Sequence, residues 1–203
     1  MSTSAAAARL EALQAQLPQY TRLLAVSKGQ SAGSMRALVE LGVRSFGESR
    51  LQEASEKQQA LADLEPLDWH FIGRLQANKV RPVVRHFSTI HSVDSLSLAE
   101  RVSRIAAEEG PDPSKGGFDP AVLRASWPQL QQLPSVQIQG LMTMAPLGLD
   151  AAERAALFAD CKALAGELGL HELSMGMSGD WPEAAQAGST WVRVGTALFG
   201  PKP

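Results

Sequence analysis

Short apolar runs alternate with longer amphipathic segments along most of this chain. The short runs are rich in β-branched residues, which is typical of strands, whereas the longer segments repeat their apolar positions with the period of an α-helix. A strand followed by a helix, repeated along the chain, predicts βα units and a parallel sheet. The predicted strands are residues 22–28, 45–48, 69–73, 89–93, 138–144, 172–177 and 191–196.

Polar capping residues mark the starts of the intervening helices. Ser, Asp and Asn favour this position because their side chains accept hydrogen bonds from the first free N–H groups of a helix. The candidate caps are Ser31 or Ser34, then Asp94, Asp150 and Asp180.

Several predicted strands read as continuous apolar runs, among them LLAVS, HFIG, IQGLMTM and WVRVG. Such runs are expected where both faces of a parallel sheet are covered. The last predicted strand also falls where it would close the pattern. We therefore predict one domain over residues 1–203, an α/β barrel of the TIM type with eight strands.

The strand count, however, reaches only seven. Between a helix ending near Glu109 and one beginning near Pro120, the chain reads GPDPSKGGFD, which has the composition of a loop. Either the fifth strand has been lost from this chain, or a segment is missing between Glu109 and Gly110. A closed barrel predicts roughly 15 to 20 more residues there, including an apolar strand.

Charge and composition exclude several classes of partner. The formal net charge is −2 and both signs are interspersed, so we expect no nucleic acid or anionic membrane as partner. No secretory or membrane-spanning pattern is present, which predicts a cytoplasmic protein.

Cys161 is the only cysteine, which excludes an internal disulfide. Its position in a helical pattern favours a small buried hydrophobe over a catalytic thiol.

Lys28 ends the run LLAVSK, at the C-terminal end of the first predicted strand. Barrels of this type place their active sites at that end of the strands. An amine there, beside apolar walls and other cations, is expected to have a lowered pKa and to form an imine with an aldehyde. The alternative is a surface lysine at the end of a strand.

Two glycine-containing loops follow the last two predicted strands. Gly176, Ser178 and Gly179 allow close backbone approach and offer a hydroxyl, and Gly195 and Thr196 offer another amide and hydroxyl. Loops at these two positions commonly bind phosphate in barrels, which predicts a phosphate site. Ordinary turn glycines before a capped helix are the alternative.

The remaining polar candidates lie within or before the predicted strands. Arg193 alternates with apolar neighbours, so it is predicted to point into the barrel, where it needs a carboxylate or a ligand nitrogen as acceptor. The histidines His70, His86 and His91 lack metal-ligand spacing and are interpreted as packing or capping residues. Tyr20, the only tyrosine, precedes the first strand and supplies no base near Lys28.

Eight sequence blocks together resemble a known family, the pyridoxal phosphate homeostasis proteins, also called the YggS/PROSC or PLP-binding protein family. The resemblance covers the chain from about Leu23 to Gly200. The blocks are AVSK, FGESRLQE, WHFIGRLQANK, HSVDS, SKGGF, GLMTM, LSMGMSGD and VRVGTALFG. The resemblance implies pyridoxal 5′-phosphate (PLP) as cofactor and a barrel similar to the N-terminal domain of alanine racemase.

The resemblance also implies a role for five residues. Lys28 would be the Schiff-base lysine, and Arg193 the partner of the pyridine nitrogen. Ser178, Gly195 and Thr196 would contact the phosphate.

Two residues depart from the family pattern, which commonly reads FGEN and IGHLQ. This chain has Ser49 and Arg74 at those positions, which puts any contact of the usual asparagine or histidine in doubt. The family also has an apolar strand before the SKGGF-like block, in agreement with the strand count.

The implied function is PLP homeostasis, in which a monomer buffers the cofactor, delivers it to apo-PLP enzymes and balances amino-acid and keto-acid pools, without turnover. An arginine facing the pyridine nitrogen weakens the ring as an electron sink, and racemisation needs a base on each face, whereas only Lys28 is evident. One alternative is a PLP-dependent racemase or a decarboxylase-like enzyme. Another is a regulatory interaction protein with vestigial cofactor binding.

Overall fold

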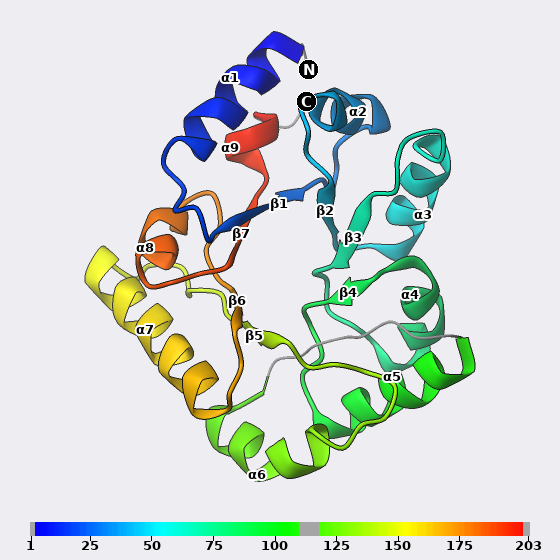
Figure 1. The fold of residues 1–203 in the computed structure, drawn as a ribbon, viewed down its shortest axis with the longest axis vertical. Coiled ribbons are helices and arrows are strands. Elements are labelled where there is room, and N and C mark those ends of the chain that lie inside the picture. The colour runs from blue at the N-terminus through cyan, green and yellow to red at the C-terminus, as the bar shows by residue number, and fades with distance from the viewer. Residues whose placement is uncertain (1–2, 110–117, 201–203) are drawn as a thin grey trace.

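Seven parallel strands form one sheet in the computed structural model, which describes residues 3–109 and 118–200. Their order is β4-β3-β2-β1-β7-β6-β5, and helices surround the sheet on its outer side (Figure 1). The α/β barrel-like fold and its seven identifiable strands are therefore confirmed. The strands are β1 (Arg22–Val26), β2 (Ser45–Glu48), β3 (Asp68–Phe71), β4 (Thr89–Ile90), β5 (Gly140–Met142), β6 (Glu172–Ser174) and β7 (Trp191–Val194).

The predicted caps are confirmed at α2 and α7 only. At α5 the prediction of Asp94 is wrong, since Ser95 Oγ accepts from the backbone N–H of Leu98. Ser31, rather than Ser34, caps α2, and Asp150 forms a capping box with Glu153 at the start of α7. Asp180 precedes α8 but makes no side-chain capping bond to it. The helices are α1 (Thr3–Gln14), α2 (Ala32–Glu40), α3 (Leu51–Ala60), the 3-10 turn η1 (Ala77–Lys79), α4 (Val80–His86), α5 (Leu96–Glu109), α6 (Pro120–Leu130), α7 (Ala151–Glu167), α8 (Trp181–Gln186) and α9 (Thr196–Phe199).

Helix α1 was not predicted from the sequence. It packs against α9, so the first and last described helices lie side by side (Figure 1). Its apolar side is short and alanine-rich, which gives a weak periodic signal.

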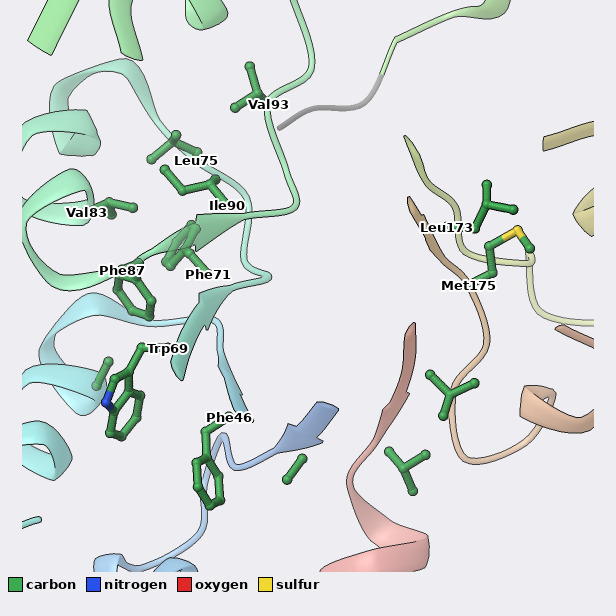
Figure 2. Close-up of a cluster of buried hydrophobic side chains, with 14 of the residues drawn as sticks. Phe46, Trp69, Phe71, Leu75, Val83, Phe87, Ile90, Val93, Leu173 and Met175 are labelled. Atoms are coloured by element: carbon green, nitrogen blue, oxygen red, sulfur yellow. The ribbon is translucent and has the colours of Figure 1, made fainter. Parts of the chain in front are cut away.

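The main hydrophobic core lies between the sheet and the helices. Phe46 and Trp69 project outward from β2 and β3 with ring centroids 6.0 Å apart, and Phe71 meets Phe87 edge-on at 5.1 Å (Figure 2). Because side chains alternate across a strand, His70, between Trp69 and Phe71, faces the barrel interior. The outer face of the sheet is therefore apolar, while part of the inner face is polar.

One flank of the barrel is the middle of the sheet, where β1 pairs with β2 and β7. Four residue pairs are in register between β1 and β7, from Arg22 with Trp191 to Ala25 with Val194. At the other flank, β4 and β5 each pair with one neighbour only within the described residues. The strand predicted between Glu109 and Gly110 would lie between them, but that position falls outside the described residues.

No helix in residues 3–109 and 118–200 is both long and apolar enough to cross a membrane.

Candidate functional site

Lys28 lies just beyond the C-terminal end of β1 and is exposed, as its sequence position predicted. The register of β1 with β7 places Gly195 beside Val26, at the same end of the sheet. A Cβ on Gly195 would lie 3.3 Å from the carbonyl oxygen of Val26, which is tighter than most such contacts. Glycine therefore allows the two strand ends to approach closely next to Lys28.

A buried charged cluster, the Lys57 cluster, anchors the residues on both sides of Lys28. On one side, Ser27 Oγ donates to Glu48 Oε1 at 2.7 Å. Lys57 Nζ donates to the same carboxylate oxygen at 2.6 Å and to the carbonyl oxygen of Ser27 at 2.7 Å. The cluster consists of Ser27, Gly29, Glu48, Glu53 and Lys57.

On the other side, Glu53 joins Lys57 to Gly29. Glu53 Oε1 accepts from Lys57 Nζ at 2.7 Å and from the backbone N–H of Gly29. Burial would raise the pKa of Glu53, but these hydrogen bonds outweigh it and lower that pKa. Burial raises the pKa of Glu48, and its Oε2 is buried without a hydrogen-bond partner among the described residues. The cluster fixes the backbone around Lys28 without using the Lys28 side chain.

The predicted phosphate loops meet at the same end of the sheet. Gly176 has a φ of +87°, and a Cβ there would collide with α8, so only glycine fits this turn. Ser178 Oγ accepts from the backbone N–H of Ala197 at 3.4 Å, which links the loop after β6 to the start of α9. Ser178 and Thr196 are exposed. The structure thus brings Ser178, Thr196 and the neighbouring Gly195 together.

Arg193 points into the barrel, as predicted, and is only 3% exposed. Its acceptors are not a carboxylate: one terminal nitrogen donates to Ser174 O at 2.5 Å and to Ser174 Oγ at 2.8 Å, and the other donates to Thr143 O at 2.9 Å. Burial lowers the pKa of Arg193 to about 10, so the guanidinium remains charged at neutral pH. The buried positive charge of Arg193 therefore lies inside the barrel, on the strand that leads to Gly195 and Thr196.

Arg193 is one end of a line of hydrogen bonds through the barrel, here called the interior chain. Ser174 Oγ lies 2.8 Å from His91 Nδ1, and His91 Nε2 lies 2.8 Å from His70 Nδ1. His70 Nε2 lies 2.5 Å from Asp68 Oδ2. The interior chain comprises Asp68 and His70 on β3, His91 directly after β4, Ser174 on β6 and Arg193 on β7.

The Asp68 end of the interior chain lines a cavity of about 190 Å³. This cavity lies at the N-terminal ends of the strands, the opposite end from Lys28, and also includes Glu172 and Trp191. The Arg22 guanidinium stacks 4.1 Å from the centroid of the Trp191 ring and pairs with Glu172. Polar groups thus reach from one end of the barrel into its interior.

Asp68 is held as a carboxylate by its neighbours. Burial would raise its pKa, but hydrogen bonds from His70, Ser88 and Ser45 outweigh burial and lower the pKa to about 2. Asp68 is therefore ionised at neutral pH and can only accept hydrogen bonds.

The sequence interpretation of His70 and His91 as packing residues missed this interior chain. The available signal was positional, because Asp68 and His70 fall two residues apart in one strand and so share its inner face. Within the described residues, no group of three or more His, Cys, Asp or Glu side chains could hold a metal ion.

Cys161 lies on α7 and is partly buried. Burial raises the pKa of its thiol to about 11, so little thiolate exists at neutral pH. This environment agrees with the prediction of a structural side chain.

Comparison with known proteins identifies close relatives. The family model of the alanine racemase N-terminal domain matches residues 1–203. The pyridoxal phosphate homeostasis protein of Synechocystis sp. is 46% identical, with 92% of this chain and 94% of the relative covered. The protein of the same name from Pseudomonas aeruginosa is 43% identical, with 90% and 85% covered.

Solved structures also match this chain. PipY of Synechococcus elongatus with PLP bound has a TM-score of 0.93 and 53% identity, with 96% of this chain and all of that chain covered. Alanine racemase from E. faecalis has a TM-score of 0.76 at 18% identity, which shows a shared fold, and this chain covers 59% of it.

The alignment with the Synechocystis relative spans 204 positions but uses only 92% of this 203-residue chain. Some aligned positions of the relative therefore have no counterpart here. The segment predicted after Glu109 would account for such positions.

Proposed function

The chain belongs to the family of alanine racemase N-terminal domains and, within it, to the pyridoxal phosphate homeostasis proteins, and from this premise we propose that it binds PLP at the C-terminal end of its barrel. Its proposed role is to hold the reactive cofactor and release it to apo-PLP enzymes in the cytoplasm.

The observation that carries this proposal is the meeting of an exposed amine with two polar loops above a buried cation. Lys28 follows β1, while Ser178 and Thr196 follow β6 and β7, and these three strands are consecutive in the sheet. Arg193 lies in the interior of the same region. An amine, a phosphate-binding turn and a fixed cation match the aldehyde, phosphate and ring nitrogen of PLP.

Each residue has one part in the proposed site. Lys28 would hold the cofactor covalently through its Nζ amine, which would condense with the aldehyde and release water. Ser178, Gly195 and Thr196 donate to the phosphate, and Arg193 donates to the pyridine nitrogen. When bound, PLP supplies an electrophilic carbon and an electron-withdrawing ring.

The same residues disfavour turnover. Because Arg193 is a cationic donor, the ring nitrogen it faces stays unprotonated, which weakens electron withdrawal. Racemisation also needs a second base. Tyr20, the only tyrosine, lies before β1 and donates to the carbonyl oxygen of Ala185 at 3.0 Å, at the other end of the strand from Lys28. We therefore propose a carrier rather than a racemase.

The decisive experiment is borohydride reduction of the PLP-loaded protein followed by peptide mass spectrometry. We expect one PLP adduct per chain, on Lys28, and its loss in Lys28→Ala. Lys79→Ala, which removes another exposed lysine, is the matched control and should retain the adduct. An equal yield of adduct in Lys28→Ala would overturn the assignment.

The carrier role is tested separately from binding. Mixing the loaded protein with a PLP-dependent apo-enzyme should restore that enzyme's activity while the carrier loses its absorption. Exchange of the α-hydrogen of alanine for deuterium at rates typical of enzymes, on the order of 1 to 1000 per second, would favour the racemase alternative instead.

A further inference from the structure

The interior chain has two ends with fixed hydrogen-bonding character. Arg193 can only donate, because a guanidinium has no acceptor. Asp68, ionised at neutral pH, can only accept. Between them lie three groups that can both donate and accept: Ser174, His91 and His70.

One end can only donate and the other can only accept. With both imidazoles neutral, this sets the direction of every hydrogen bond between them. Since Asp68 accepts, His70 Nε2 carries the proton in their 2.5 Å contact. A neutral His70 then accepts at Nδ1, so His91 donates from Nε2. A neutral His91 accepts at Nδ1, so the Ser174 hydroxyl donates to it. Ser174 Oγ in turn accepts from Arg193.

Every link in this arrangement is satisfied with both imidazoles neutral and in the Nε2–H form. An additional proton on either ring would reverse at least one link. On His91 it would also place a second positive charge one hydroxyl away from the buried Arg193 guanidinium, which is costly in the low-dielectric interior. All four members other than Asp68 are at most 5% exposed, so water offers little compensation.

We propose that Asp68, His70, His91 and Ser174 form a one-directional hydrogen-bond relay that positions the Arg193 guanidinium toward the C-terminal end of the barrel. The relay links the carboxylate at the N-terminal cavity to the arginine facing the ligand. The four residues are positioning residues, since each acts through the next.

The geometry explains why a relay is needed. Arg193 has three hydrogen bonds: two go to backbone carbonyls, and the third goes to the Ser174 hydroxyl, whose orientation depends on its bond with His91. The relay fixes that hydroxyl from behind. The relay also places the negative charge of Asp68 at one end and the buried positive charge of Arg193 at the other.

The relay itself is tested without PLP. Long-range proton–nitrogen NMR of the histidine rings at neutral pH should show His70 and His91 as neutral Nε2–H tautomers. A protonated ring or an Nδ1–H tautomer at either position would overturn the proposed direction.

The positioning role rests on the proposed PLP function and is tested with variants. His91→Leu removes both links of that residue and should shift the absorption maximum of bound PLP and weaken PLP binding about tenfold. His91→Gln retains one donor and one acceptor and should restore most of both properties. His86→Leu, a half-buried histidine bonded to Gln58 outside the relay, is the control and should change neither.

The outcomes separate the two proposals. If the wild-type protein fails to bind PLP, the proposed function falls while the NMR result still decides the relay. If the wild type binds and a folded His91→Leu matches it in absorption and affinity, the positioning role is wrong. Should His91→Leu fail to fold, Asp68→Asn provides the same test, because it removes the terminal charge at a partly exposed position and should shift the absorption in the same sense.

Discussion

The two flanks of the barrel, the middle of the sheet around β1 and the two edge strands β4 and β5, differ in how they are held together. At one, β1 pairs with β2 and β7, and the Lys57 cluster locks β1 to β2 and α3. At the other, β4 and β5 have one partner strand each within the described residues. Of the residues proposed to bind PLP, Arg193 lies on β7 and the others follow β1, β6 and β7, at or beside the first flank.

Within the described residues, the proposed site therefore lies beside β1, β6 and β7, which have two partner strands each. Edge strands lose half of their ladder hydrogen bonds and are locally less stable. The interior chain crosses this division, because His91 directly follows β4 and Ser174 lies on β6. The interior chain therefore connects the end of β4, which has one partner strand within the described residues, to Arg193.

The largest expected effect comes from breaking the Lys57 cluster. Lys57→Met leaves Glu48 buried without its cation, which should lower the free energy of unfolding by about 3–5 kcal/mol. Arg124→Met, which breaks an exposed pair with Glu167, should cost less than about 1 kcal/mol. Urea unfolding followed by tryptophan fluorescence measures both.

The double variant Glu48→Gln/Lys57→Met sharpens this result. It removes the buried charge as well, so part of the lost stability should return. Equal losses in Lys57→Met and Arg124→Met would contradict the anchoring role of the cluster.

The same substitution at the two flanks should give different costs. Leu24 on β1 is fully buried, so Leu24→Ala should cost about 2–5 kcal/mol. Leu141 on β5 is only partly buried, and Leu141→Ala should cost about 1 kcal/mol or less. Thermal and urea unfolding compare the two, and a larger loss at Leu141 would reverse the proposed ranking of the flanks.

Asp68 gives a smaller, pH-dependent effect. Its pKa falls from 3.8 to about 2 on folding, so its contribution to stability is present above about pH 4 and is lost as the pH falls toward 2. With 42% of the side chain exposed, solvent screening limits this to about 1 kcal/mol. Asp68→Asn should therefore flatten the acid limb of the stability curve, whereas an unchanged limb would show that the native pKa is not depressed.

The smallest effect is local. The amides of Ile90 and Leu141, on strands with one partner each, should exchange with deuterium at least about tenfold faster than those of Leu24 and Ala25, on a strand with two. Hydrogen-exchange NMR reads all four positions. Similar protection across both flanks would mean that the edges are supported in another way.

The sequence by itself determined the repeated βα pattern, all seven strands and the position of Lys28 at a strand end. These features depend on local periodicity and chain direction, which residue type and spacing encode. It also placed Arg193 inside the barrel, because alternation along a strand is a local rule. The predicted strands were too long at their C-terminal ends, as at 172–177 against Glu172–Ser174, because apolar residues continue into loops that leave the sheet.

The tertiary structure alone decided which polar groups meet. Ser27, Glu48 and Lys57 come together only after β1, β2 and α3 have packed, and the interior chain joins four strands from separate parts of the sequence. No local pattern reveals such contacts, so His70 and His91 looked like packing residues. A buried polar group must find its partner wherever the fold places one, and that requirement acts across the sheet rather than along the chain.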